Sequence, residues 1–272
     1  MMRALRFTIL AVGGVLGILY VLAMTALYFG QEQMIFHAAR LPEDFKYESS
    51  QPYEDCSIRC RDGNTLNGLL FKTAEPKGVV LYLHGNAGTI AQWGAIGPDY
   101  TALGYDILVL DYRGYGKSEG EIDSEAQFLD DVSAAYQMLE ERYQNIVIVG
   151  YSIGTGPSAY LASKFSPSAL VLQAPYYSLL ELADSRVPFV PDFLKKYRFE
   201  TNLYLPKVKC PVYIFHGTED RLIVFSHGKR LSELLPKGQS QLFPLSGVGH
   251  GGINQDDRFL AELKNILDRA AI

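Results

Sequence analysis

The chain has 272 residues, 48% of them hydrophobic and 20% charged, which is enough apolar material for one sizeable core and suggests a single main domain. Its formal net charge is −5, and its first thirty residues contain two arginines and no acids, so the remainder is more acidic still. An acidic domain without runs of Lys or Arg is a poor nucleic-acid binder, and we expect no nucleic-acid partner.

The first element in chain order is an uncharged run of 23 residues, 7–29, which is long enough to span a bilayer with some tilt. A cleaved signal peptide is the main alternative, but its apolar core is normally about 7–15 residues long and precedes a small-residue cleavage site. No such site follows Tyr28. A buried core helix is a third interpretation, and the absence of a polar face argues against it. We therefore predict that residues 1–30 form an uncleaved membrane anchor and that residues 31–272 form the main domain.

The charges beside this anchor predict its orientation. Arg3 and Arg6 flank its N-terminal side, whereas the other flank begins with Glu32 and reaches its first basic residue only at Arg40. The positive-inside rule then places the N-terminus in the cytoplasm and the main domain on the extracytoplasmic side.

Three cysteines, Cys56, Cys60 and Cys210, are too few for a disulfide framework. Cys56 and Cys60 lie in a predicted strand, where four residues span about 13 Å, too far for a disulfide. Free thiols are mildly at odds with an oxidising compartment and so weigh against the predicted orientation. No metal-ligand spacing is present, and we expect neither a metal nor an organic cofactor.

The rest of the chain alternates apolar runs with helical patterns. Predicted strands cover 56–61 and 66–72, separated by a turn at 62–65, and then 79–83, 107–110, 146–149, 169–173, 212–215 and 241–245. Predicted helices lie near 93–103, from Ser124 onward, from the turn after 149 to about 163, and at the C-terminus, where Phe259, Leu260, Leu263, Ile266 and Leu267 share one face. Continuous apolar strands alternating with helices predict an α/β fold, a mostly parallel sheet covered on both faces, with function at the carboxyl ends of the strands.

One of these strand ends carries a nucleophile motif. The run 146–149 is followed directly by Gly150-Tyr-Ser-Ile-Gly154 and then by the start of a helix rich in small residues. Gly-x-Ser-x-Gly between a strand and a helix is the nucleophile elbow. Because the turn forces the serine into a strained backbone conformation, the positions two residues before and after it must lack a Cβ atom. The sequence therefore predicts Ser152 as a catalytic nucleophile.

A serine nucleophile needs a base, and the base needs a carboxylate that fixes its tautomer. In this type of fold the chain order is serine, acid, histidine, so only His227 and His250 are candidates for the base. His227 begins a predicted helix seven residues after Asp220, so one strand end would have to supply both groups. His250 lies in a glycine-rich loop after the last predicted strand, and Asp220 follows the strand 212–215. We predict His250 as the base and Asp220 as its partner.

The negative oxygen that forms during acyl transfer requires two preorganised N–H donors. One predicted donor is the backbone amide of Ile153, directly after the serine. The other is the amide of Asn86, in the loop that follows the strand 79–83. His84 begins the same loop, and we expect it to brace the loop rather than act as a second base.

Two further motifs do not carry cofactor chemistry. Gly116-Lys-Ser118 resembles the end of a phosphate-binding P-loop, but Asp111 occupies the position where that motif requires a glycine. Gly154-Thr-Gly156 has Ala159 where a dinucleotide fingerprint has its third glycine. Both are read as turn glycines.

Together these segments resemble the α/β-hydrolase superfamily, and more narrowly the membrane-tethered α/β-hydrolase-domain serine hydrolases and their bacterial relatives. The segments are His84-Gly-Asn-Ala-Gly88, Asp111-Tyr-Arg-Gly-Tyr-Gly-Lys-Ser-Glu-Gly120, Gly150-Tyr-Ser-Ile-Gly154, His216-Gly-Thr-Glu-Asp220 with Ser226-His-Gly228, and Gly249-His250. The resemblance runs from about residue 31 to the C-terminus and implies the same triad and the same two amides. It departs at Leu222-Ile-Val224, where many relatives carry a proline. Family members cleave esters, thioesters and lipids, and some are labelled aminopeptidases, so the reaction class carries over better than the substrate.

An insert at about 176–209, between two predicted strands, is expected to cover the elbow as a short cap. It is rich in large apolar residues and carries Pro188 and Pro191, which exclude one regular helix. Some of its apolar side chains are expected to line a short acyl groove. Asp184 and Asp192 in this insert are read as solvated charges.

The leading hypothesis is a membrane-anchored serine hydrolase that acts on small or lipid-like acyl esters or thioesters. One alternative is a serine peptidase or amidase, which should show an acidic pair for a substrate amine, and no such pair can be located. Another is a hydrolase fold used as a non-catalytic binding module, which would usually have lost a member of the triad.

Overall fold

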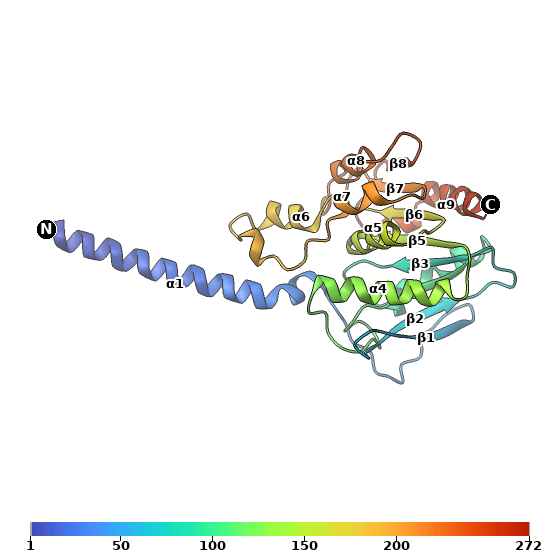
Figure 1. Ribbon diagram of the computed structural model, residues 1–272, viewed down its shortest axis with the longest axis horizontal. Coiled ribbons are helices and arrows are strands. Elements are labelled where there is room, and N and C mark those ends of the chain that lie inside the picture. Colours follow the sequence, from blue (N-terminus) through green and yellow to red (C-terminus); the bar gives the residue numbers. More distant parts are fainter. Residues whose placement is uncertain (1, 272) are drawn as a thin grey trace.

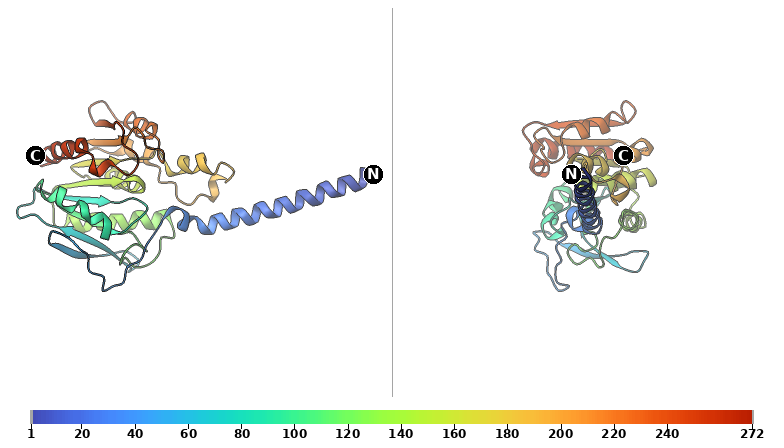
Figure 2. Two further views of the ribbon diagram at one scale, coloured as in Figure 1. Left: turned by 180° about the vertical axis from the view of Figure 1, so that it is seen from behind. Right: turned by 90° about the vertical axis from the view of Figure 1, so that its left-hand side faces the viewer.

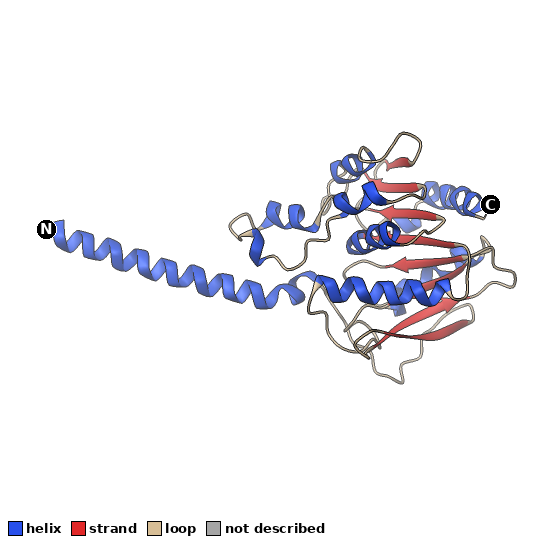
Figure 3. Cartoon of the chain, viewed as in Figure 1, coloured by secondary structure: helices blue, strands red, loops and turns tan. Residues whose placement is uncertain are grey.

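The computed structural model describes residues 2–271. The first residue of the predicted anchor (1–30) and the last residue of the predicted main domain (31–272) lie outside the described residues. An α/β body is preceded by one long helix, α1 (Met2–Ile35), which projects away from it (Figure 1). The helix leaves the body on the side toward which the parallel strands point (Figure 3).

Within the described chain, eight strands form one sheet in the order β1-β2-β4-β3-β5-β6-β7-β8. They are β1 (Tyr53–Arg59), β2 (Thr65–Phe71), β3 (Val79–Leu83), β4 (Asp106–Leu110), β5 (Ile146–Tyr151), β6 (Ala169–Gln173), β7 (Val212–Gly217) and β8 (Ser240–Leu245). The predicted hairpin is present, because β1 and β2 pair in antiparallel register, and β2 also pairs antiparallel with β4. The strands from β4 to β8 are parallel, which confirms the predicted α/β fold.

The helical segments after α1 lie on both faces of this sheet. They are α2 (Ile90–Trp93), η1 (Gly94–Ile96), α3 (Gly97–Thr101), α4 (Glu125–Glu140), η2 (Ser152–Gly154), α5 (Thr155–Lys164), α6 (Leu179–Arg186), η3 (Asp192–Leu194), α7 (Thr201–Tyr204), η4 (Leu205–Lys207), α8 (Ser226–Ser232), η5 (Ile253–Gln255) and α9 (Asp257–Ala270). The side chain of Ser124 caps α4, as its position in the sequence predicts.

The prediction of a helix near 93–103 is wrong in one respect, because the segment forms three short pieces, α2, η1 and α3. The cause is its packing against β2. A Cβ atom added to Gly97 would lie 2.8 Å from the ring of Phe71, and one added to Gly94 would lie 3.3 Å from it. Two glycines and Pro98 allow this close approach but do not support one continuous helix.

Alternate residues of the central strands point to two separate hydrophobic cores. Leu81 and Leu83 belong to a core shared with α4, α5 and α8, whereas Val80 and Tyr82 belong to one shared with α2, α3 and α9. The second set of helices faces the viewer when the molecule is seen from behind (Figure 2). Burial on both faces explains why these strands read as continuous apolar runs.

Helix α1 is longer than the predicted anchor, because it continues through Ile35 without a break at residue 30. Its apolar part, Leu5–Ile35, contains 31 residues with a mean hydropathy of 2.3, and its length of about 46 Å is sufficient to cross a membrane. Most of its large apolar side chains are exposed. Met34 and Ile35, which lie beyond the predicted anchor, are the last residues of this helix.

The buried side chain of Arg113 joins three separate segments of the body. Its guanidinium donates hydrogen bonds of 2.5 and 2.8 Å to Asp131 on α4, and bonds of 2.6 and 2.9 Å to Asp62 in the β1–β2 turn. The Arg113 side chain is 3% exposed and that of Asp131 is 8% exposed, so solvent screens this pair weakly.

We predict that Arg113→Met lowers the free energy of unfolding by about 3–5 kcal/mol, because it leaves the buried Asp131 carboxylate without its partner. Arg61→Met is the matched control. Its side chain is 87% exposed and pairs with Asp130 only at the surface, so the expected change is within about 0.5 kcal/mol. Chemical denaturation of both variants in detergent tests this. Equal losses of unfolding free energy in the two variants would contradict the proposed contribution of the buried Arg113 pair.

Candidate active site

Ser152 stands at the sharp turn between β5 and α5. Its φ angle is 52°, in the left-handed region that non-glycine residues rarely adopt, which costs about 1–3 kcal/mol. The surrounding structure fixes this conformation: η2 begins at the serine itself, and the hydroxyl of Thr155 donates a 2.6 Å hydrogen bond to the carbonyl of Ser152. The hydroxyl of Ser152 is thereby held at the carboxyl end of the sheet.

The two glycines of the elbow are required by close backbone packing. A Cβ atom at Gly154 would lie 2.2 Å from the carbonyl oxygen of Leu83, and one at Gly150 would lie 2.3 Å from the hydroxyl of Ser158. Neither position has room for a side chain, so the sequence-based reason for these glycines is correct.

The structure brings the three side chains predicted as a triad into one hydrogen-bonded chain. His250 Nε2 lies 2.9 Å from Ser152 Oγ, and His250 Nδ1 lies 2.7 Å from Asp220 Oδ2. Since the carboxylate can only accept, the proton of the neutral imidazole belongs on Nδ1, and Nε2 is free to accept from the serine. The three residues come from three different strand ends, after β5, β7 and β8.

The carboxylate of Asp220 is fully buried, yet its environment favours the charged form. Burial alone would raise its pKa, but the hydrogen bond from His250 and those from the amides of Ile223 and Leu222, at 2.9 and 2.8 Å, outweigh this and lower the pKa. His216 is also buried nearby and donates from Nε2 to the carbonyl of Ile223 at 2.7 Å. Burial lowers the pKa of His216, so it braces this loop as a neutral imidazole.

The two residues predicted to supply amide donors border the same pocket as the serine. Asn86, Ile153 and Ser152 all line it. Ile153 is the second residue of η2, and N–H groups in the first turn of a helix have no partner within the helix. The Asn86 carbonyl accepts hydrogen bonds from the amide of His37 at 2.9 Å and from the hydroxyl of Tyr115 at 2.8 Å. These two bonds fix the loop at Asn86.

Two tyrosines support the site and were not assigned a role from the sequence. The hydroxyl of Tyr151 donates to the carbonyl of His250 and anchors the histidine loop. The hydroxyl of Tyr176, first residue of the predicted insert, donates to the carbonyl of Ile153 at 3.0 Å and accepts from the amide of Gly156 at 3.2 Å. Tyr151 sits inside the Gly-x-Ser-x-Gly motif, but nothing in that motif indicates where its hydroxyl goes.

The insert forms a broken cap, as its prolines indicate, consisting of α6, η3, α7 and η4. An apolar pocket of about 450 Å³ lies between this cap, the elbow and α1. From the cap it is lined by Leu179, Leu182, Val187, Val190 and Leu194 among others. From α1 it is lined by Leu27, Tyr28, Gln31, Met34 and Ile35, which the sequence alone did not place here.

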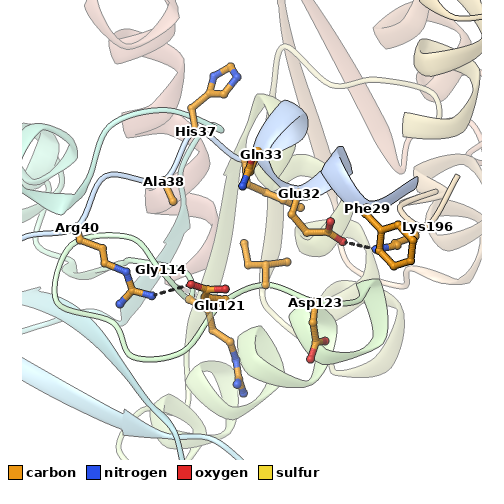
Figure 4. Close-up of a pocket in the computed structure, with 13 residues that line it drawn as sticks. Phe29, Glu32, Gln33, His37, Ala38, Arg40, Gly114, Glu121, Asp123 and Lys196 are labelled. Carbon is orange, nitrogen blue, oxygen red and sulfur yellow. Dashed lines mark hydrogen bonds and ion pairs between the residues drawn. The ribbon is translucent and has the colours of Figure 1, made fainter. Parts of the chain in front are cut away.

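A second, larger cavity of about 700 Å³ also borders α1 but does not include Ser152, Asp220 or His250 (Figure 4). Two ion pairs lie along it, Glu32 with Lys196 at 3.0 Å and Arg40 with Glu121 at 3.7 Å, and Asp123 also lines it.

The residues that the sequence argument set aside are engaged elsewhere. His227 Nδ1 accepts a 3.1 Å hydrogen bond from the amide of Tyr177, so this imidazole supports the cap. Asp184 and Asp192, interpreted as solvated charges, are 43% and 61% exposed, and both pair with Lys195 within the cap. Among the described residues no group of three His, Cys, Asp or Glu side chains could hold a metal ion, and the three cysteines are buried and unpaired.

Comparison with known proteins agrees with this architecture. A family model described as alpha/beta hydrolase fold matches residues 78–205. The chain is 32% identical over 244 residues to alpha/beta hydrolase domain-containing protein 17B of Homo sapiens, a match that covers 84% of this chain and 81% of the relative. The chain therefore belongs to the α/β-hydrolase family, and its membership supports a hydrolase activity.

Other relatives match over less of their length. Alpha/beta hydrolase domain-containing protein 17C of Mus musculus is 35% identical over 213 residues, and the match covers 74% of this chain but only 63% of that relative. Among solved structures, an esterase of Pyrococcus furiosus superposes with a TM-score of 0.68 at 18% identity, covering 87% of this chain and 99% of that one. Est1E of Butyrivibrio proteoclasticus superposes with a TM-score of 0.65 at 20% identity, covering 80% and 100%. At such identities these structures show the fold alone.

The lowered pKa of Asp220 predicts how this residue contributes to stability. Its folded pKa lies below the unfolded value of about 3.9, so its stabilisation is complete above that value and is lost as the pH falls through the folded pKa. As the pH falls below about 4, the difference in unfolding free energy between the wild type and Asp220→Asn should shrink, because the carboxylate is then protonated. Denaturation curves at several pH values test this, and a difference that grows with acidity would contradict it.

Proposed function

We propose that this protein is a membrane-anchored serine hydrolase that cleaves acyl esters or thioesters through an acyl-enzyme. The observation that carries the proposal is the hydrogen-bonded chain from Ser152 through His250 to Asp220, with the serine in the left-handed conformation of a nucleophile elbow. Family membership supports the same reaction class.

In this mechanism Ser152 Oγ attacks the acyl carbonyl carbon while its proton moves to His250 Nε2. The Asp220 carboxylate accepts from Nδ1–H and stabilises the imidazolium. The amides of Asn86 and Ile153 donate to the negative oxygen. The tetrahedral intermediate collapses, the alcohol or thiol leaves with the proton from Nε2, and the acyl group remains on Ser152. Water, deprotonated by His250 Nε2, then attacks this ester, and the acid leaves as Nε2 returns the proton to Ser152 Oγ.

The surroundings of the serine favour an acyl substrate over a peptide with a free amine. The pocket is lined mainly by apolar side chains, and none of the described residues that line it is an Asp or Glu that could hold an ammonium group. Two cationic residues border it, but Lys195 is held by Asp184 and Asp192, and Arg186 donates to the carbonyl of Leu222 at 3.0 Å. A serine amidase acting on apolar substrates remains the alternative, and comparison of matched ester and amide substrates decides between them.

We predict that Ser152→Ala abolishes labelling by a fluorophosphonate probe and lowers ester turnover by about three orders of magnitude or more, because no other group replaces the nucleophile. Ser163→Ala is the control. Its hydroxyl donates only to the carbonyl of Tyr160 on α5, and the variant should be labelled like the wild type. Labelling that persists in Ser152→Ala would refute the assignment, and a non-catalytic binding protein would not be labelled in any form.

For the membrane topology we propose a single pass by α1, with the N-terminus in the cytoplasm and the catalytic body on the other side. The length and hydropathy of α1 support the span, and Arg3 and Arg6 on its N-terminal side support the direction.

This topology predicts that the protein stays in the membrane fraction during an alkaline carbonate wash. Protease added to the extracytoplasmic side of sealed vesicles should digest the body, while a tag fused before Met1 is protected. The reverse pattern of protection would overturn the orientation without affecting the catalytic proposal.

A further inference from the structure

One face of α1 is packed against the catalytic body rather than left exposed. Met24 is only 6% exposed, and Leu27, Gln31 and Ile35 are half-buried. These positions recur every three or four residues and so lie on one face of the helix. On other faces, by contrast, Leu22 is 60% exposed. The last three turns of α1 therefore have a protein-facing side, which a simple tether would not need.

Polar contacts fix this side of α1 to the cap. The side-chain amide of Gln31 donates to the carbonyl of Leu194 at 2.7 Å and accepts from the amide of Lys196 at 2.9 Å. The carboxylate of Glu32 pairs with Lys196 Nζ at 3.0 Å and accepts from the hydroxyl of Tyr197 at 2.9 Å. The pair of Glu32 and Lys196 is visible at the edge of the larger cavity (Figure 4). These half-buried bonds give α1 and the cap a defined relative position.

The end of α1 is also bonded to the loop that carries a proposed oxyanion donor. The side chain of Asn86 donates to the carbonyl of Ile35, the last residue of the helix, at 3.1 Å. A second bond joins the same two segments: the amide of His37, two residues after the end of α1, donates to the carbonyl of Asn86 at 2.9 Å. Helix α1 is thus bonded both to the cap and to the loop that carries Asn86, and both of these segments border the pocket of Ser152.

From these contacts we propose that the C-terminal turns of α1, through Leu27, Tyr28, Gln31, Met34 and Ile35, form one wall of the acyl-binding site and set the length of acyl chain that the enzyme accepts. This inference rests on the proposed function, and it makes the membrane helix a specificity-determining part of the active site. The five side chains line the same 450 Å³ pocket as Ser152, Asn86 and Ile153. An acyl group bound to the serine would extend from the elbow between α1 and the cap.

The position of this wall indicates where the acyl chain comes from. Next to α1 the cap exposes two aromatic side chains, Phe189 (59% exposed) and Phe193 (81% exposed). The hydroxyl of Tyr20 donates to the carbonyl of Phe189 at 3.0 Å, which places the cap tip about 22 Å along the helix from Ile35. Tyr20 lies near the middle of the uncharged run 7–29, so the cap tip lies at the depth of the acyl chains of the bilayer. The substrate class is therefore an ester or thioester whose acyl chain resides in the bilayer.

The test changes the size of the wall in the full-length protein, reconstituted in lipid nanodiscs. The measured quantity is the ratio of kcat/KM for p-nitrophenyl laurate to that for p-nitrophenyl butyrate, per fluorophosphonate-labelled protein. Leu27→Trp should lower this ratio at least about tenfold, since each methylene kept out of the pocket costs about fourfold. Leu27→Ala should shift the preferred chain length upward. Leu22→Trp, on an exposed face of the same helix, should leave the ratio unchanged.

Opposite shifts from the two Leu27 variants cannot arise from partial unfolding, because loss of folded protein lowers the labelled fraction without reversing a preference. Chain-length profiles of both Leu27 variants that match that of Leu22→Trp would overturn the role of α1. If the wild type is labelled in that case, the proposed serine hydrolase stands and only the wall is refuted. If the wild type is not labelled at Ser152, the proposed function falls and this inference falls with it.

Discussion

The structure of the site depends on one close approach between backbone segments, the contact of the turn after β5 with the end of β3. Gly154 packs so tightly against the carbonyl of Leu83 that any side chain would collide with it. This contact holds Ser152 in its left-handed conformation and sets the elbow beside the loop that carries Asn86. The proposed nucleophile and the two proposed oxyanion donors therefore lie just beyond the ends of two fully buried central strands, β3 and β5.

Around this rigid centre the remaining groups are held by tyrosine hydroxyls and buried imidazoles. Tyr151 anchors the loop of His250, Tyr176 anchors the carbonyl of Ile153, and neutral His216 braces the loop of Asp220. Each of these supports comes from a strand end or its continuation. The arrangement explains how a base on one loop and an acid on another keep distances of 2.9 and 2.7 Å in the chain from serine to carboxylate.

Helix α1 has two faces with different surroundings. The exposed face is apolar and long enough for a membrane, while the other packs on the cap and on Asn86. Residues of α1 on both sides of position 30, among them Leu27 and Ile35, line the pocket of Ser152. The unbroken helix through Ile35 supports treating the anchor and the catalytic body as one functional unit.

The sequence alone indicated the order of strands and helices, the elbow at Ser152 and the choice of His250 and Asp220. It could do so because burial on both faces of a sheet, glycine at a strained turn, and a fixed order along the chain are local or one-dimensional signals. It could not show that Tyr151 and Tyr176 bond to distant carbonyls, or that Leu27 and Ile35 reach the pocket of Ser152. An apolar helix has the same sequence pattern whether its residues contact lipid, a cap or a substrate. Hydropathy does not indicate which partner a side chain contacts. Only the tertiary structure, through the contacts of Gln31 and Glu32 with the cap, decided which face of α1 packs against the body.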